Sequence, residues 1–244
     1  MYIMDDGVRL NAALDLPAAQ SRCPLVILFH GFTGHMEERH ILAVSEAIRA
    51  AGCASLRVEL YGHGRSGGSF AGHTLYKWLT NALTVIDYAR GLDFATELYL
   101  CGHSQGGLTV MLAGAMKREQ IAGLIPLSPA WSIPAEARQG VFLGERFDPE
   151  HIPASLAPWG LDGNYLRVAR TIHVEEAIDR YRGPVLIVHG TADETIPVEW
   201  GVRAAERYRD AEFVPVPGDT HCYDHHLDQV TEAVRSWLER RTAH

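Results

Sequence analysis

The pentapeptide GHSQG at residues 102–106 fits the pattern G-x-S-x-G. An apolar run, Leu98 to Cys101, precedes it, and a stretch of helical period, Gln105 to Met116, follows it. A serine on so sharp a strand-to-helix turn is exposed above the end of its strand. The free N–H groups of the following helix favour an oxyanion at the same place. The pattern in this context predicts that Ser104 is a nucleophile, and the alternative is a tight glycine turn without chemistry.

A serine hydroxyl is a poor nucleophile at neutral pH and needs a base. Where serine occupies such a turn, an acid and then a histidine follow it in the chain. His221 comes directly after the last apolar run and before the last helical stretch. We therefore expect His221 to be the general base, while His225 and His226 lie nearer to the final helix.

The acid that orients this base is expected just beyond an earlier strand. Asp193 ends the segment HGTAD, at residues 189–193, which follows the apolar run Val185 to His189. Glu194 is a less favoured neighbour. Asp219 is the second choice, because it lies too close to His221 in sequence to fold back easily onto the same ring.

The segment HGFTG, at residues 30–34, follows the first central apolar run. Its position predicts one half of an oxyanion hole, made by the Phe32 N–H, with the Gln105 N–H as the other half. The alternative is that Phe32 is a core residue and His30 ends a strand.

Two other patterns suggest different chemistry. Residues 62–67 fit G-x-G-x-x-G, which would bind a dinucleotide if a helix began at its third glycine. The chain stays glycine-rich until Thr74, and Asp87 falls inside a helical stretch, so we interpret the segment as a tight loop near the active site. The histidines at 221, 225 and 226 with Cys222 match no common zinc spacing, so no metal site is expected.

Apolar runs alternate with stretches of helical period, which is typical of an α/β fold with a mostly parallel sheet and helices on both faces. The expected strands are Leu25 to His30, Ala54 to Leu60, Leu98 to Cys101, Ile121 to Leu127, Val185 to His189 and Glu212 to Val216. The expected helices are Glu38 to Ala51, Thr74 to Arg90, Gln105 to Met116, Pro197 to Tyr208 and Gln229 to Arg240. Asp6-Gly7 predicts a hairpin between Tyr2–Met4 and Val8–Leu16.

The chain of 244 residues is expected to form a single domain over residues 1–244. Residues 129–182 interrupt the alternation with several prolines and two tryptophans. This stretch is too long for a simple loop, so it is expected to be a lid or small subdomain inserted over the carboxyl edge of the sheet.

Composition limits the partners. The formal net charge is −8 and no block of Lys or Arg is present, so nucleic acid is not expected as a partner. The longest apolar runs are too short to cross a bilayer, and the first residues do not resemble a signal peptide. The four cysteines are widely spaced, as reduced thiols are. We expect a cytoplasmic protein without membrane contact, and both monomer and homodimer are compatible with the sequence.

The segments HGFTGHMEERH, YGHGRSGG, GHSQGG, LIPLSPA, VLIVHGTAD and GDTHCYDHHL together resemble the bacterial cinnamoyl and feruloyl esterases of the α/β-hydrolase superfamily. The resemblance runs over nearly the whole chain. It implies hydrolysis, without a cofactor, of esters of ferulate, p-coumarate or caffeate, with Ser104, Asp193 and His221 as the triad. It also implies that the oxyanion hole is formed by Phe32 and Gln105.

The same resemblance implies an insertion that holds the hydroxycinnamoyl ring. Glu136 matches an acid that accepts from the ring hydroxyl, Tyr165 resembles its partner, and Trp159 resembles an aromatic wall. Glu136 is one methylene longer than the aspartate of some relatives. The alternative for all three side chains is ordinary lid packing or exposure to solvent.

Two other functions are alternatives to this interpretation of the motifs. A general short-chain acyl esterase, lipase or acyltransferase could use the same triad. A binding protein that has lost catalysis would not be expected to keep all five catalytic positions.

Overall fold

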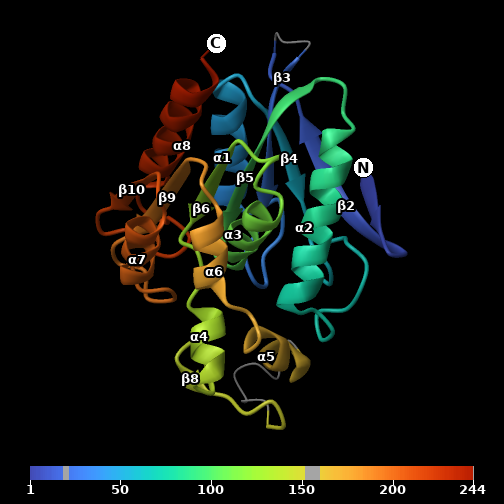
Figure 1. Cartoon of the computed structure of the whole chain (residues 1–244), viewed down its shortest axis with the longest axis vertical. Helices are drawn as coiled ribbons and strands as arrows, with labels where there is room; N and C mark the ends of the chain where they lie inside the picture. The colour runs from blue at the N-terminus through green and yellow to red at the C-terminus, as the bar shows by residue number, and fades with distance from the viewer. Residues whose placement is uncertain (19–21, 152–159, 244) are drawn as a thin grey trace.

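The computed structural model describes residues 1–18, 22–151 and 160–243, and its centre is a mostly parallel sheet (Figure 1). Within these ranges the sheet has eight strands in the order β1-β2-β4-β3-β5-β6-β9-β10. The pairs β1–β2 and β2–β4 are antiparallel, and every pair from β4 to β10 is parallel. The α/β fold class predicted from the alternating pattern is therefore confirmed.

The strands of this sheet are β1 (Tyr2–Asp5), β2 (Val8–Asp15), β3 (Cys23–Phe29), β4 (Ala54–Val58), β5 (Ala95–His103), β6 (Gly123–Leu127), β9 (Val185–Gly190) and β10 (Ala211–Val216). The helices beside it are α1 (Arg39–Ala50), α2 (Leu75–Arg90), α3 (Gln105–Met116), α7 (Glu199–Arg207) and α8 (Leu227–Thr242). The largest difference from the expected ranges is in β5, which begins at Ala95 rather than Leu98. No helix in the described part of the chain is long and apolar enough to cross a membrane.

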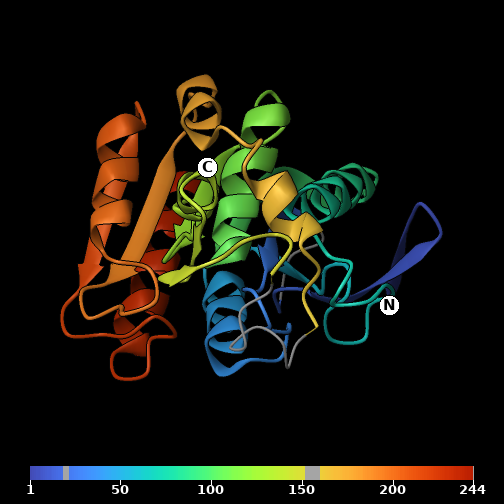
Figure 2. The same cartoon turned by 90° about the horizontal axis from the view of Figure 1, so that it is seen from below.

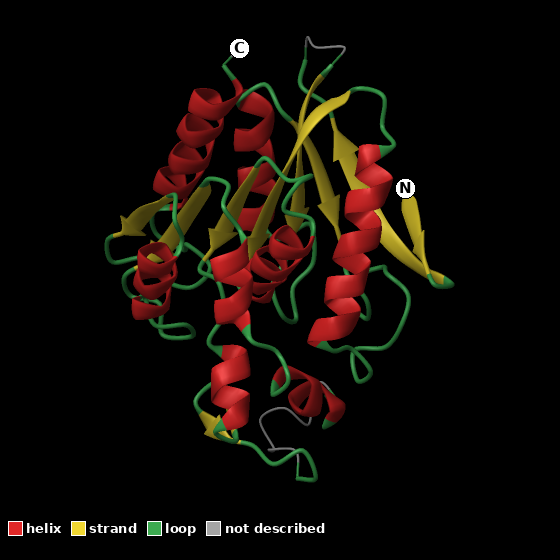
Figure 3. Cartoon of the chain, viewed as in Figure 1, coloured by secondary structure: helices red, strands yellow, loops and turns green. Residues whose placement is uncertain are grey.

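Alternate residues of each central strand pack on opposite faces of the sheet. Val26 and Leu28 of β3 lie in a core with residues of α1 and α8. Leu25 and Ile27 lie in the core on the other face, with residues of α2 and α3. This period of two follows from the pleat of a strand. Helices cover both faces (Figure 3), which explains why the central strands are apolar at nearly every position.

A long segment leaves the sheet after β6 and returns at β9. It contains α4 (Ile133–Arg138), β7 (Val141–Phe142), β8 (Glu145–Arg146), α5 (Asn164–Ala169) and α6 (Val174–Arg180). Most of it lies beyond the carboxyl ends of the parallel strands (Figure 1), and Figure 2 views the molecule from that side. We interpret it as the lid predicted for residues 129–182.

Candidate active site

Ser104 lies on the turn between β5 and α3, in a backbone conformation that L-residues rarely adopt. Its φ is 56° and its ψ is −119°. Hydrogen bonds hold this geometry, because the Ser104 N–H donates to the Leu127 carbonyl at 2.9 Å and the Ser104 carbonyl accepts from Leu108 and Ala130. A Cβ on Gly102 or Gly106 would lie 2.4 Å from a backbone oxygen. The two glycines of the motif are therefore required by space.

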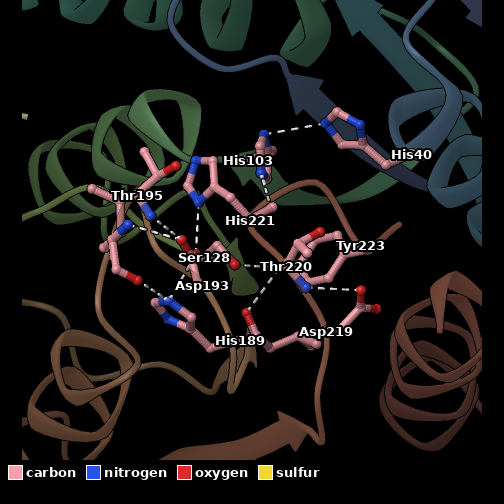
Figure 4. Close-up of polar contacts among 12 residues, drawn as sticks. His40, His103, Ser128, His189, Asp193, Thr195, Asp219, Thr220, His221 and Tyr223 are labelled. Atoms are coloured by element: carbon pink, nitrogen blue, oxygen red, sulfur yellow. Dashed lines mark hydrogen bonds and ion pairs between the residues drawn. The ribbon is translucent and has the colours of Figure 1, made fainter. Parts of the chain in front are cut away.

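His221 and Asp193 meet in a short hydrogen bond (Figure 4). The Nδ1 atom of His221 donates to Oδ2 of Asp193 at 2.6 Å. Because an ionised carboxylate has no proton to give, Nδ1 carries the hydrogen and Nε2 keeps its lone pair. His221 and Ser104 line the same pocket. The structure thus brings together the three residues predicted as a triad.

Asp193 is a buried carboxylate with many donors. Oδ1 accepts the N–H groups of Thr195 at 2.9 Å and Ile196 at 2.8 Å. Oδ2 also lies 3.2 Å from Nε2 of His189. Burial alone would raise the pKa of Asp193, but the hydrogen bonds from His189 and His221 outweigh it and hold that pKa well below its usual range. Asp193 is therefore ionised at neutral pH and can stabilise an imidazolium at His221.

Asp219, the second choice of acid, has a different set of partners. It is fully buried and accepts the backbone N–H groups of Thr220, His225 and His226 at 2.9 to 3.0 Å. These bonds fix the loop that carries His221 to the start of α8. Asp219 thus serves the backbone of this loop, whereas Asp193 contacts the ring of His221.

Two further histidines support His221 and were not predicted from the sequence. Nε2 of His40 donates to Nδ1 of His103 at 3.1 Å, and Nε2 of His103 donates to the His221 carbonyl at 2.8 Å (Figure 4). The rings of His103 and His221 lie 4.7 Å apart. Burial, and then the neighbouring His40, hold the pKa of His103 well below its usual value, so this ring is neutral. His103 is the variable position of the G-x-S-x-G motif, which carries no signal for such a contact.

The loop that follows β3 lies against Ser104. A Cβ on Gly31 would be only 3.1 Å from the Ser104 Cβ, which is a tight contact, so the backbone of this loop approaches the nucleophile closely. Phe32 follows in the loop and lines the pocket beside Ser104. Gln105 is the first residue of α3, at the helix end where N–H groups face an anion. Both residues predicted for the oxyanion hole thus lie next to Ser104.

The pocket at Ser104 has a volume of about 220 Å³. Its apolar side is formed by Phe32, Ala130, Ile133, Phe142 and Leu143, and its polar side includes Glu38 and Thr195. A larger surface groove of about 430 Å³ lies between α2, α3 and α6. It contains none of the predicted catalytic residues, so the smaller and more enclosed pocket is the candidate site.

The residues predicted to hold the ring of the substrate do not line the pocket in the described part of the chain. Tyr165 is fully buried, and its hydroxyl donates to Oε1 of Gln105 at 2.6 Å. Burial, and then the nearby negative charge of Glu136, raise the pKa of Tyr165 well above its usual value. Among the described residues that line the pocket, neither Glu136 nor Tyr165 appears. Trp159 lies outside the described residues.

The segments that suggested other chemistry have a different local structure in the described part of the chain. There, no group of three His, Cys, Asp or Glu side chains is arranged to hold a metal ion. The glycine-rich segment at 62–67 is a closed loop, in which Gly62 N–H donates to the Gly67 carbonyl at 2.9 Å. The next helix, α2, begins only at Leu75 with Thr74 as its cap.

The model of the family described as serine aminopeptidase, S33, matches residues 20–167, which is more than half of the chain. The model described as TAP-like protein matches residues 165–243. Est1E from Butyrivibrio proteoclasticus, in a structure with ferulic acid bound, is 56% identical, with a TM-score of 0.96 and all of both chains covered. The resemblance to the bacterial esterases predicted from the motifs is thereby confirmed.

More distant proteins share the fold. The structure of a Paleococcus ferrophilus monoacylglycerol lipase is 21% identical with a TM-score of 0.72, covering 95% of this chain and 99% of the other. The human mitochondrial palmitoyl-protein thioesterase ABHD10 is 22% identical over 197 residues, covering 77% of this chain. The match spans 63% of the length of that relative. Together with the fold and the motifs, the family model that matches residues 20–167 and the 56% identity with Est1E show that the chain belongs to the α/β-hydrolase superfamily, in which it is a serine esterase.

Proposed function

We propose that this protein hydrolyses esters of hydroxycinnamic acids such as ferulate, p-coumarate and caffeate. The observation that carries the proposal is the 56% identity over the full chain with a protein whose structure contains ferulic acid. The small pocket at Ser104 agrees with it, because Phe32 and Phe142 offer flat apolar surfaces for an aromatic acyl group.

In the first half of the proposed reaction, Nε2 of His221 takes the proton of Ser104 as its Oγ attacks the ester carbonyl. The tetrahedral oxyanion is stabilised by the N–H groups of Phe32 and Gln105. His221, now positively charged, is stabilised by ionised Asp193. It then gives its proton to the departing alcohol, and an acyl-enzyme remains.

In the second half, water takes the place of the alcohol. His221 removes a proton from the water, whose oxygen attacks the acyl-enzyme, and Ser104 leaves with the returned proton. All of these steps use side chains, backbone amides and water, so the mechanism requires no cofactor or metal.

For the ring of the substrate, we propose that Glu136 accepts a hydrogen bond from the ring hydroxyl. Its support is its place in α4, three residues after the pocket residue Ile133, together with its nearness to Tyr165, whose hydroxyl donates to Gln105. Tyr165 would then link the ring pocket to the residue that follows the nucleophile. The role of Trp159 as an aromatic wall stays a prediction from the resemblance.

The test compares methyl ferulate, methyl p-coumarate and p-nitrophenyl butyrate as substrates at about pH 7. We expect the wild type to prefer the hydroxycinnamates by at least about tenfold in kcat/KM, and Ser104→Ala to lose several orders of magnitude on every substrate. A wild type that cleaves only the butyrate well would leave the triad intact and overturn the substrate class. Activity retained by Ser104→Ala would overturn the mechanism.

A cytoplasmic location is a separate prediction, and both a monomer and a homodimer agree with the sequence. The four cysteines are free in the structure, in line with the reduced thiols expected from the sequence. Cell fractionation would test the location, and light scattering on the purified protein would test the oligomeric state.

A further inference from the structure

Two buried histidines connect the loop after β3 with the loop after β4. His30 begins the first loop, and its Nε2 accepts the N–H of Leu60 in the second loop at 3.1 Å. His63 lies in the second loop, and its Nε2 accepts the N–H of Thr33 in the first at 3.2 Å. Each histidine therefore bonds the backbone of the other's loop, and the two rings lie 5.3 Å apart.

The partners of these rings fix their protonation. A backbone N–H can only donate, so both Nε2 atoms must carry a lone pair. The remaining hydrogen is then on Nδ1, which donates to the Gly31 carbonyl at 2.8 Å in His30 and to the Tyr61 carbonyl at 3.0 Å in His63. Both rings use both nitrogens, and both must be neutral to do so.

The surroundings of the pair keep it neutral. The indole of Trp78 packs against both rings, at 5.1 Å from His30 and 4.8 Å from His63. Burial, and then the neighbouring His63, lower the pKa of His30 to about 3. Burial also lowers the pKa of His63, although Glu59 acts in the opposite direction. The other titratable groups that face the pair are His35, His40 and His73.

These bonds determine where the Phe32 amide points. The Gly31 carbonyl accepts both His30 Nδ1–H and the Gly34 N–H, the latter at 3.1 Å. In a trans peptide the carbonyl and the next N–H point in opposite directions, so the Phe32 N–H is directed away from His30. The next residue, Thr33, has a φ of 62°, which is strained for a β-branched side chain. Its N–H is the one held by His63.

We propose that His30 and His63 are positioning residues for the oxyanion hole. His30 sets the orientation of the Gly31–Phe32 peptide, and His63 holds Thr33 in the strained conformation that keeps this peptide in place. This inference rests on the proposed function in one respect, which is that Phe32 donates to the oxyanion. The inference also assigns a role to the glycine-rich loop at 62–67, because that loop positions His63 beside the active site.

The test uses two polar substitutions that each keep one of the two bonds of His63. In His63→Gln the side-chain amide ends near the place of Nε2 and can still accept the Thr33 N–H. In His63→Asn the amide ends near the place of Nδ1, so it keeps the bond to Tyr61 and loses the bond to Thr33. Both variants lose the ring and its packing on Trp78.

We expect His63→Asn to lose about 10- to 100-fold in kcat with KM within about threefold of wild type, because the oxyanion interaction is made in the transition state. His63→Gln should stay within about fivefold of the wild-type kcat. Ser66→Ala is the matched control, since the Ser66 hydroxyl bonds Glu59 and Asn11 in the same glycine-rich loop. It should lower Tm and leave kcat unchanged.

Equal kcat in the Gln and Asn variants would overturn the inference, and so would losses that follow Tm across all three variants. The oxyanion hole acts on every ester, so kcat should fall alike with methyl ferulate and with p-nitrophenyl butyrate. The positioning role can therefore be tested on the butyrate even if hydroxycinnamates are not the substrates, which keeps the two proposals separable.

Discussion

Asp193 and Asp219 are two buried aspartates in neighbouring loops, and their partners differ in kind. Asp193 bonds the ring of His221, whereas the bonds of Asp219 go to backbone N–H groups. A carboxylate that contacts an imidazole can orient it and stabilise its positive charge. A carboxylate that accepts only amides fixes a loop. Asp193 and Asp219 are the same residue type in neighbouring loops, and their hydrogen-bond partners show which of them acts on His221.

The first prediction compares Asp193→Asn with Asp219→Asn. Asparagine at 193 can still accept the Thr195 and Ile196 N–H groups, so the fold should survive while kcat falls by about 1,000- to 10,000-fold. Asparagine at 219 keeps one acceptor for its loop and should lower Tm while leaving kcat within about tenfold. Steady-state kinetics on methyl ferulate and thermal unfolding measure both. If Asp219→Asn were the more damaging to kcat, the assignment of Asp193 as the acid would be wrong.

For single residues, the sequence predicts a functional role where that role depends on the strand, turn or loop in which the residue itself lies. The strand, turn and helix around Ser104, and the loop ends that carry Asp193 and His221, were predicted from neighbouring residues. The contacts of His40 with His103, and of Tyr165 with Gln105, join residues 63 and 60 positions apart. No pattern along the chain specifies such pairs, because packing of distant elements decides them.

At the scale of elements, the hairpin β7–β8 in the insertion forms one wall of the pocket. Leu143 and Gly144 join its strands, both with positive φ, at 50° and 81°. Such a turn suits the twist of a two-residue hairpin. The hairpin brings Phe142 and Leu143 to the pocket, and the Phe142 ring also contacts Tyr165 at 5.2 Å. The elements of the insertion are two to seven residues long, too short for periodicity to predict.

The second prediction concerns Phe142→Ala. The side chain is 1% exposed, so its loss should destabilise the protein by about 3 kcal/mol or more. Because it also lines the pocket, kcat/KM for methyl ferulate should fall by about tenfold more than that for p-nitrophenyl butyrate. Phe147→Ala is the control, as Phe147 is equally buried in the insertion but does not line the pocket. A change of the same size in the substrate ratio for both variants would argue against a role of Phe142 in selectivity.

At the scale of the whole molecule, the described part of the chain contains several buried histidines whose pKa is lowered. Burial is the main cause that lowers the pKa of His30 and His73 to about 3 and that of His40 to about 4. In the unfolded chain these groups titrate near 6.5. Between the two values the unfolded state binds more protons than the folded state, so the free energy of unfolding falls as the pH falls.

The third prediction is therefore acid sensitivity that begins well above the range of the carboxylates. At about pH 4.5 each of these histidines should reduce the free energy of unfolding by about 2 to 3 kcal/mol relative to pH 7, an order-of-magnitude value. Urea unfolding at pH 7, 5.5 and 4.5 measures the effect. His73→Gln should be less stable than wild type at pH 7 and show a shallower dependence on pH. Constant stability from pH 7 to 4.5 would contradict the prediction.

The insertion begins after β6 and ends at β9, and these two strands are neighbours in the sheet, with Leu127 opposite Val188. Because the two strands are parallel, the insertion leaves at the carboxyl end of β6 and returns to the amino end of β9, and the pairing of β6 with β9 does not depend on the length of chain between them. Ser104, Asp193 and His221 all come from outside this segment. A family built on this plan could exchange the segment that supplies Phe142 and Leu143 to the pocket, by mutation, recombination or grafting, and would still inherit the residues proposed to break the ester bond.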